Sequence, residues 1–183
     1  MRKCVQVLMV ISIAALVSGC MTVTLKRLNA MTAETDKAKL DDAFGRITAI
    51  LVDRGFDIKV GNKDIGLVST EYKQVGSVAG SPPFDFYLQV KATLKQTPAN
   101  KLSVKLTPLV KEVNRLNPAA FTEHGLPLMA ENQTPVTDLE KVNFAAQTSY
   151  MAVAQGVAEA LGLSLQEMQQ DVEISTKKSC LGM

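Results

Sequence analysis

The chain has few of the residues from which catalytic and metal sites are usually built. Its 183 residues include one histidine, His124, and three cysteines. CxxC, HExxH and aspartate-rich calcium-loop patterns are missing, so the sequence gives no support for a metal site. General-base catalysis by His124 would require a neighbouring nucleophile and an orienting acid, which the sequence does not place. We therefore expect an exposed loop histidine, no catalytic residue, no cofactor and no enzymatic activity.

Patterns for phosphate binding are also missing. Residues 76–81 are rich in glycine, serine and alanine, but no lysine and no helix pattern follow them. A phosphate-binding loop needs both, because the lysine and the helix amino terminus supply the positive charge. This segment is expected to be a flexible loop.

Long apolar runs are scarce as well. The longest spans Val5–Val17, about thirteen positions, which is short for a helix that must cross ~30 Å of hydrocarbon. Two basic residues precede the run and two small residues, Ser18 and Gly19, follow it. A positive start, a short apolar stretch and small residues in this order predict a signal peptide over residues 1–19.

The segment Leu16-Val17-Ser18-Gly19-Cys20 resembles the bacterial lipobox. The resemblance implies cleavage between Gly19 and Cys20, a thioether-linked diacylglycerol on the cysteine and an acyl chain, such as palmitate, on its amine. Two or three chains hold a protein firmly on a membrane where one does not. Met21 stands where an aspartate would imply retention at the inner membrane, so the expected location is the outer membrane. An ordinary secretory signal remains the alternative.

Processing would change both the charge and the cysteine content. Loss of residues 1–19 removes two basic residues, so the 20 basic and 18 acidic residues become 18 and 18. A net charge near zero argues against nucleic acid as a partner. Cys180 would be the one free thiol, which excludes an internal disulfide. It would either cross-link two chains or be incidental in a C-terminal tail over residues 175–183.

Hydrophobic patterning predicts a tether over residues 20–37 and one domain over 38–174. The tether has no sustained periodicity. Apolar residues from Leu40 to Leu51 recur at helical spacing and Gly55 ends them, so a helix is expected over about residues 36–54. A capping box, Thr137 to Glu140, begins a second helix. Its apolar stripe consists mostly of small residues: Val142, Ala146, Ser149, Val153, Gly156, Val157 and Ala160.

Between the helices the pattern has a period of two, which predicts strands. The alternation covers 56–60, 68–72, 86–94 and 102–106, with turn residues at 62–66 and 98–101. Pro108 has no N–H to donate, so a bulge or an edge is expected there, followed by a shifted alternation at Leu109, Lys111 and Val113. A weaker apolar pattern over 163–172 would add a turn or a strand. The order α-β-β-β-β-α predicts an α+β fold, with both helices on one face of an antiparallel sheet of four or five strands.

Two groups of residues are candidates for interaction. The first is the polar face of the sheet away from the helices, which carries Tyr87, Gln89, Lys91, Lys95 and Lys105. A solvated face is the alternative. The second is the pair of long loops, 76–85 and 117–135, with exposed apolar residues that suggest a partner. The alternative is that these loop residues pack onto the domain's own core. The loop residues are Phe84, Phe121, Leu126, Leu128 and Met129.

The first helix and hairpin carry a second resemblance. Ala43-Phe44, Leu51, Gly55-Phe56, Ile58, Asp64, Gly66-Leu67 and Thr70 are similar to a pattern in the helix-grip domains of BamC-like outer-membrane lipoproteins. This resemblance implies a helix-grip-like fold in an outer-membrane lipoprotein. The first hypothesis for its role is a non-enzymatic lipoprotein that binds another cell-envelope protein in an accessory or assembly role. The alternative is a carrier of an apolar or amphiphilic ligand between the C-terminal helix and the sheet. The sequence lacks the catalytic residues that a hydrolase of the cell wall or of lipids would need.

Overall fold

The computed structural model describes residues 21–129, 135 and 137–179. The predicted signal peptide, its cleavage site at Gly19 and Cys20, and Cys180 lie outside these residues. The chain divides into two compact units, one of which spans Lys26–Glu173. The other contains the described residues 21–25 and 174–179. The domain expected over 38–174 therefore begins earlier, at Lys26.

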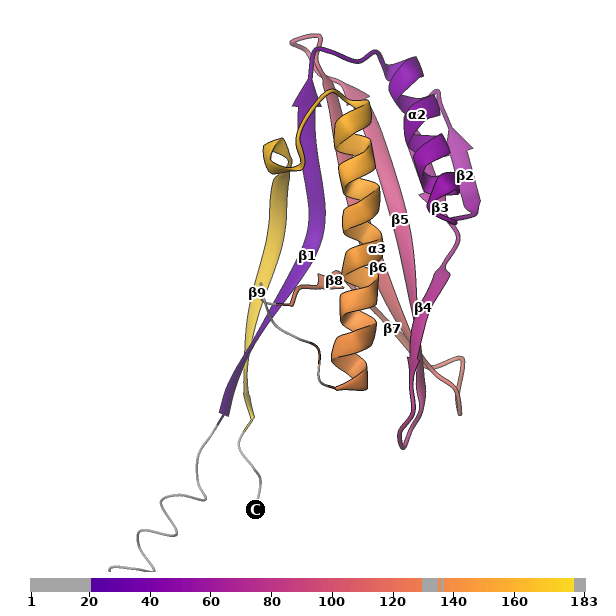
Figure 1. Ribbon diagram of the computed structural model, residues 1–183, viewed down its shortest axis with the longest axis vertical. Helices are drawn as coiled ribbons and strands as arrows, with labels where there is room; N and C mark the ends of the chain where they lie inside the picture. The colour runs from indigo at the N-terminus through magenta and orange to yellow at the C-terminus, as the bar shows by residue number, and fades with distance from the viewer. Residues whose placement is uncertain (1–20, 130–134, 136, 180–183) are drawn as a thin grey trace, which may run out of the picture. The chain divides into compact units, whose positions relative to one another are not determined.

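The described residues form nine strands, two α-helices and one 3-10 turn, so the predicted α+β class is confirmed (Figure 1). Nine strands exceed the predicted four or five. The elements are β1 (Met21–Thr35), α2 (Leu40–Asp53), β2 (Ile58–Asn62), β3 (Leu67–Thr70), β4 (Lys73–Val78), β5 (Phe84–Gln96), β6 (Leu102–Asn114), β7 (Phe121–His124), β8 (Leu126–Pro127), α3 (Asp138–Ala160), η1 (Leu165–Glu167) and β9 (Gln169–Ser179).

The strands belong to one sheet with the order β2-β3-β5-β6-β1-β8. β4 also pairs with β5, β7 with β6, and β9 with β1. The long hairpin of β5 and β6 is the centre of this sheet, and its register runs without a shift from Phe84 opposite Asn114 to Gln96 opposite Leu102. The hairpin therefore fixes which side chains share a face.

Both helices cover one face of the sheet. α3 packs against β4, β5, β6 and β8, while α2 packs against β2, β3, β5 and α3 (Figure 1). Gly156 of α3 faces Ile50 of α2, where an added Cβ would lie 3.1 Å from a methyl group. This small residue lets the helices approach each other. The core between helices and sheet includes Ala43, Ile47, Leu51, Phe56, Leu88, Val90, Leu94, Leu106, Val110, Val153 and Val157.

The predicted start of α3 is confirmed. The Thr137 hydroxyl accepts the Glu140 N–H at 3.2 Å, and the Glu140 carboxylate accepts the Thr137 N–H at 2.9 Å. The predicted stripe is displaced by one position in its middle, because Tyr150 and not Ser149 is buried. Tyr150 is the largest of the fully buried side chains in the described core.

The expected tether is wrong for residues 21–35, which form β1. Leu28, Met31 and Ala33 are buried, and Met31 to Thr35 pair antiparallel with β6. The sequence shows no clean alternation because two neighbours, Ala30 and Met31, are both buried. The strand is thus specified by its pairing with a distant segment.

Four further strands occupy segments expected as loops, tail or a weak pattern. β4 lies at the start of the expected 76–85 loop, and β7 and β8 lie within the expected 117–135 loop. β9 extends through residues 175–179 of the expected tail. The turn or strand expected from the weak apolar pattern over 163–172 is confirmed by η1 and the first residues of β9. The described side chains of β9 from Gln169 to Thr176 are mostly exposed, so the rest of the strand has no hydrophobic pattern. Main-chain pairing can form a strand without such a pattern.

Pro108 does not interrupt β6. It lies opposite Val90 in an unshifted register and is buried, and the alternation continues to the buried Val110. The expected bulge and the expected change of phase are therefore wrong, whereas the alternative expectation, an edge position, holds locally at Pro108. On its other side β6 pairs with β1 at residues 102–106 and with β7 at 110–113, so Pro108 falls between the two partners. Proline is tolerated where no ladder bond is required.

The turn between β2 and β3 forms where turn residues were predicted. The Asn62 side chain accepts the N–H groups of Asp64 and Ile65, and Gly66 closes the turn with φ +61. An added Cβ on Gly66 would lie 2.1 Å from the carbonyl oxygen of Leu94. Glycine is required at this position because both the conformation and the space exclude a side chain.

Candidate functional site: the polar face of the sheet

The face of the sheet away from the helices is polar, as the alternation predicts. Along β5 the core side carries Phe86, Leu88, Val90, Ala92 and Leu94, which are all buried. The intervening residues include the predicted Tyr87, Lys91 and Lys95, and both lysines are exposed. Gln89 is an exception among them, since it is 9% exposed and donates to the Thr70 carbonyl at 2.6 Å.

On this outer face lysines stand opposite hydroxyl side chains. Each lysine of this part of β5 or β6 pairs across the hairpin with a threonine or serine, and β1 adds one more threonine beside Lys105. The pairs are Lys91 with Thr107, Thr93 with Lys105, Lys95 with Ser103, and Thr32 with Lys105. The arrangement offers ammonium and hydroxyl donors alternately over two strands and the edge of a third.

A groove of about 480 Å³ runs over this part of the face. Its lining contains three lysines, three threonines, one serine and one leucine, and no acidic residue. The lining residues are Thr32, Lys91, Thr93, Lys95, Ser103, Lys105, Thr107 and Leu109. A groove with this lining favours a negatively charged ligand or surface.

The three lysines of the groove have no acidic partner within the part of the chain that the structure describes. The ion pairs found there join other lysines, arginine or histidine to acids. Glu34 of β1 is the nearest acid by register and lies diagonally across from Lys105, since Thr32 pairs with Lys105 and Glu34 with Ser103. Diagonal neighbours lie roughly 7–8 Å apart, and no ion pair joins these two residues.

At the other end of the outer face, aromatic side chains surround Lys111. The Lys111 ammonium lies 4.0 Å from the ring centroid of Phe121 and 5.4 Å from that of Tyr72. The Tyr72 hydroxyl donates to Glu123 at 2.9 Å. Burial raises the pKa of Tyr72, and the hydrogen bond to Glu123 and the charge of Glu123 raise it further. Lys111 is therefore held by cation–π contacts, unlike the three groove lysines.

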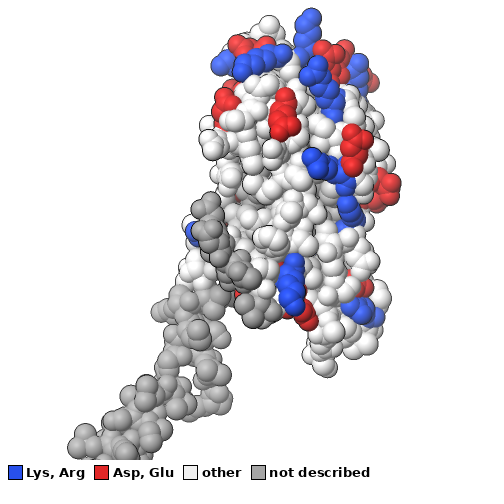
Figure 2. Space-filling view, in the orientation of Figure 1, with Lys and Arg blue, Asp and Glu red and all other residues white. Residues whose placement is uncertain are grey.

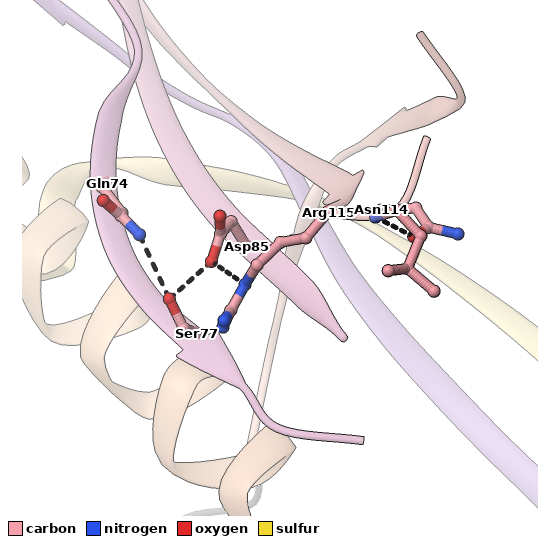
Figure 3. Close-up of polar contacts among 6 residues, drawn as sticks. Gln74, Ser77, Asp85, Asn114 and Arg115 are labelled. Atoms are coloured by element: carbon pink, nitrogen blue, oxygen red, sulfur yellow. Dashed lines mark hydrogen bonds and ion pairs between the residues drawn. The ribbon is translucent and has the colours of Figure 1, made fainter. Parts of the chain in front are cut away.

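A second acid near this end, Asp85, is also engaged. Its carboxylate accepts a hydrogen bond from the Ser77 hydroxyl at 2.6 Å and from the Arg115 Nε at 2.8 Å (Figure 3). Gln74 donates to the Ser77 hydroxyl at 3.1 Å. These contacts join the start of β5 to β4 and to the residue after β6. Because Arg115 pairs with the charge of Asp85, this carboxylate does not serve as an ion-pair partner for the groove lysines.

The predicted loop residues are separated by the structure. Phe84 and Phe121 line one pocket of about 220 Å³, together with Glu112, Asn114, Ala120 and Thr122. Phe121 remains 49% exposed, whereas Leu128 packs against the hydrophobic core. Tyr87 lies on the outer face opposite Lys111. Leu128 thus belongs to the core, whereas Tyr87 and Phe121 both lie beside Lys111 and Phe84 shares a pocket with Phe121.

The prediction that His124 is an exposed loop residue is wrong. It ends β7, its side chain is 10% exposed, and its Nε2 lies 2.6 Å from a carboxylate oxygen of Glu112. Its Nδ1 lies 2.8 Å from the Gly125 carbonyl oxygen. No sequence pattern indicated this contact, because Glu112 lies in a different strand. Both ring nitrogens face acceptors, which gives the residue a structural role in joining β7 to β6.

Several residues of the outer face could not be identified in advance. Tyr72 and Phe121 approach Lys111 from the junction of β3 and β4 and from β7, and those contacts depend on long-range pairing. Thr93, Ser103 and Thr107 could have been found, since they occupy the polar phase of the strands that were predicted. The sequence signal for them is a hydroxyl residue at the outward-facing positions of the predicted strands.

The opposite, helix-bearing side differs in charge. In Figure 2, charged side chains gather near the end where α3 finishes, and the surface over the middle of α3 is almost free of them. From Val142 to Ala158 the helix contains no charged residue. The space between α3 and the sheet, where a carrier would hold its ligand, is filled by side chains of the core, including Tyr150, Val153 and Val157.

The described residues contain neither a metal-ion cluster nor a membrane-spanning helix. Within them, no group of three or more histidine, cysteine or acidic side chains is arranged to hold a metal ion. No helix among residues 21–129 and 137–179 is long and apolar enough to cross a membrane.

Comparison with known proteins does not identify a family for the chain. No family model and no curated protein matches the chain. A solved crystal structure of a TBP-like protein from Parabacteroides distasonis ATCC 8503 is similar to it with a TM-score of 0.43 and 12% sequence identity. The similarity covers 78% of this chain and 94% of that chain. A likeness of this size carries no inference about function.

Proposed function

We propose that the chain is a non-enzymatic lipoprotein of the bacterial envelope, held on the outer membrane through acylated Cys20, whose α+β domain binds another envelope protein. The resemblance of residues 16–20 to a lipobox supports the anchor. We also propose that the domain is a helix-grip fold, with α3 lying across the sheet. The packing of both helices on one face supports this fold.

The observation that carries the binding role is the groove on the outer face. Three exposed lysines without acidic partners in the described part of the chain stand among hydroxyl side chains on strands whose backbone is already paired. Unpaired charges of one sign on a rigid sheet favour recognition of a partner, because electrostatic complementarity steers association and selects among partners. A carrier would instead need an open cavity under α3, where buried side chains lie.

Site-specific photo-crosslinking in intact cells tests this function. A photoreactive amino acid at Thr93, in the middle of the groove, should yield a specific crosslinked product that contains an envelope protein. The same amino acid at Gln155, on the exposed side of α3, is the matched control and should yield none. Mass spectrometry identifies the products. Extracted lipid without any protein product at Thr93, or a product at Gln155 alone, would contradict the proposal.

A further inference from the structure

The charge of the groove suggests the chemistry of the partner. The three lysines are exposed, unpaired in the described part of the chain and carried by strands β5 and β6. We propose that this groove binds an extended acidic segment of the partner protein, whose carboxylates meet Lys91, Lys95 and Lys105. This inference rests on the proposed binding function and gives the class of its partner.

The spacing of the lysines matches an extended acidic chain. Lys105 lies opposite Thr93, which stands midway between Lys91 and Lys95 on β5. Diagonal neighbours on paired strands have side chains roughly 7–8 Å apart. In an extended chain, residues at alternate positions are about 7 Å apart and point to the same side. Acidic residues at every second position would therefore meet successive lysines.

The same geometry disfavours a single compact anion such as phosphate. Compact phosphate sites use backbone N–H groups at a helix amino terminus or the forked guanidinium of arginine. The groove lining has neither, and β5 lies between β3 and β6, where its backbone groups serve the sheet. Separate lysines over about 480 Å³ fit several separate charges better.

Two residues mark the ends of the proposed site. At one end the Lys111 ammonium already contacts the rings of Phe121 and Tyr72, so a carboxylate would compete with these cation–π contacts. At the other end stands the exposed Glu34, one strand beyond Ser103. An acidic segment that reaches this edge would be repelled by Glu34. Neutralising that residue should therefore strengthen binding.

A direct binding measurement tests the inference. The full-length protein is purified in a non-ionic detergent and titrated into a fluorescein-labelled peptide of about nine residues that alternates glutamate and threonine. Fluorescence anisotropy should report salt-sensitive binding, stronger at ~50 mM than at ~300 mM NaCl. The K91S/K95S/K105S variant should bind about tenfold more weakly or worse, and E34Q should bind more tightly than the unaltered protein.

The matched control removes three positive charges elsewhere. Lys59, Lys63 and Lys141 form exposed ion pairs outside the groove, which contribute little to stability. The K59S/K63S/K141S variant should bind the glutamate peptide within about twofold of the unaltered protein. Equal loss in both triple variants would overturn the inference. So would equal binding of the corresponding glutamine peptide, or preferential binding of tripolyphosphate or of phosphatidylglycerol vesicles.

Failure of this inference can be told apart from failure of the proposed function. The K91S/K95S/K105S changes are combined with the photoreactive amino acid at Thr93. If recognition is acidic, the yield of the crosslinked partner should fall at least about fivefold. An unchanged yield would support the proposed binding of a partner protein. It would overturn the inference that the lysines recognise an acidic segment of that partner. Circular dichroism of each variant establishes that it is folded.

Discussion

The Tyr150 hydroxyl of α3 donates a hydrogen bond to the Leu106 carbonyl oxygen of β6, with 3.1 Å between the oxygens. It is the one large polar side chain among the fully buried residues of the described core, and it joins the long helix directly to the central hairpin. Its burial raises the pKa of the hydroxyl, opposed by a backbone hydrogen bond with Met31. The core therefore depends on a neutral tyrosine.

This position predicts a loss of stability at alkaline pH. An unfolded tyrosine ionises near pH 10, and the folded one ionises at higher pH. Its contribution to folding is thus complete below pH 10 and is lost as pH rises toward the folded pKa. Tyr150→Phe should cost about 1 kcal/mol at neutral pH, through the missing hydrogen bond, and should lose less stability than the unaltered protein between about pH 9 and 11.

Urea unfolding at about pH 7, 9 and 11 measures both effects. Tyr87→Phe is the control, because Tyr87 lies on the outer face and is partly exposed. That variant should keep the alkaline sensitivity of the unaltered protein. Identical pH profiles for the unaltered protein and Tyr150→Phe would refute the assigned role of Tyr150.

A second prediction concerns the turn between β2 and β3. Gly66→Ala places a methyl group against the Leu94 carbonyl in a left-handed conformation, so it should cost about 3 kcal/mol or more. Gly45→Ala is the control, since nothing lies within 4 Å of its added Cβ and α2 is helical there. Helix propensity should make that variant more stable by up to about 1 kcal/mol. Thermal unfolding compares the two; similar midpoints would argue against the strained turn.

The contact of His124 with Glu112 gives a third prediction. His124→Ala removes a nearly buried partner of both Glu112 and Gly125, so unfolding should become easier by about 2 kcal/mol. A double-mutant cycle with Glu112→Ala should show coupling of at least about 0.5 kcal/mol, because the two side chains are in contact. Strict additivity of the two changes in chemical denaturation would show that the contact does not stabilise the protein.

A fourth prediction follows from the proposed lipid anchor. Cys20→Ser should move the protein from the membrane pellet to the aqueous fraction, since serine cannot carry the thioether-linked lipid. Cys180→Ser is the matched control and should stay with the membrane. Detergent-free fractionation and mass spectrometry of the amino terminus provide the measurement. Release of the unaltered protein, or membrane retention of Cys20→Ser, would exclude this mode of anchoring.

The parts of the fold that sequence could predict are those specified by nearby residues. The capping box at Thr137 and the alternation along β5 are local, and both appear where the pattern placed them. β1 was missed because its partner, β6, is remote in the chain and its own sequence lacks alternation. At Pro108 the sequence could not decide between a bulge and an edge position, because the neighbouring strands that determine whether an N–H is needed are likewise specified by long-range pairing.

In the candidate site too, the sequence predicts the features that depend on nearby residues and misses those that depend on long-range pairing. Lys91, Lys95 and Lys105 could be assigned to one face from alternation alone. Their register with Thr107, Ser103 and Thr93 depends on the turn at residues 97–101 and had to come from the structure. The pairing of His124 with Glu112 joins two strands whose sequences carry no common signal.

The unshifted pairing of β5 with β6 ties the lysine face to the interior. Because successive side chains point to opposite sides, a slip of one residue would turn Lys91 and Lys95 inward and bring Val90 and Leu94 to the surface. A shift of the whole register by one residue would thus disrupt the core and the charged surface together. An exposed outward side chain can therefore be substituted without moving the core, whereas a change of register alters both faces at once.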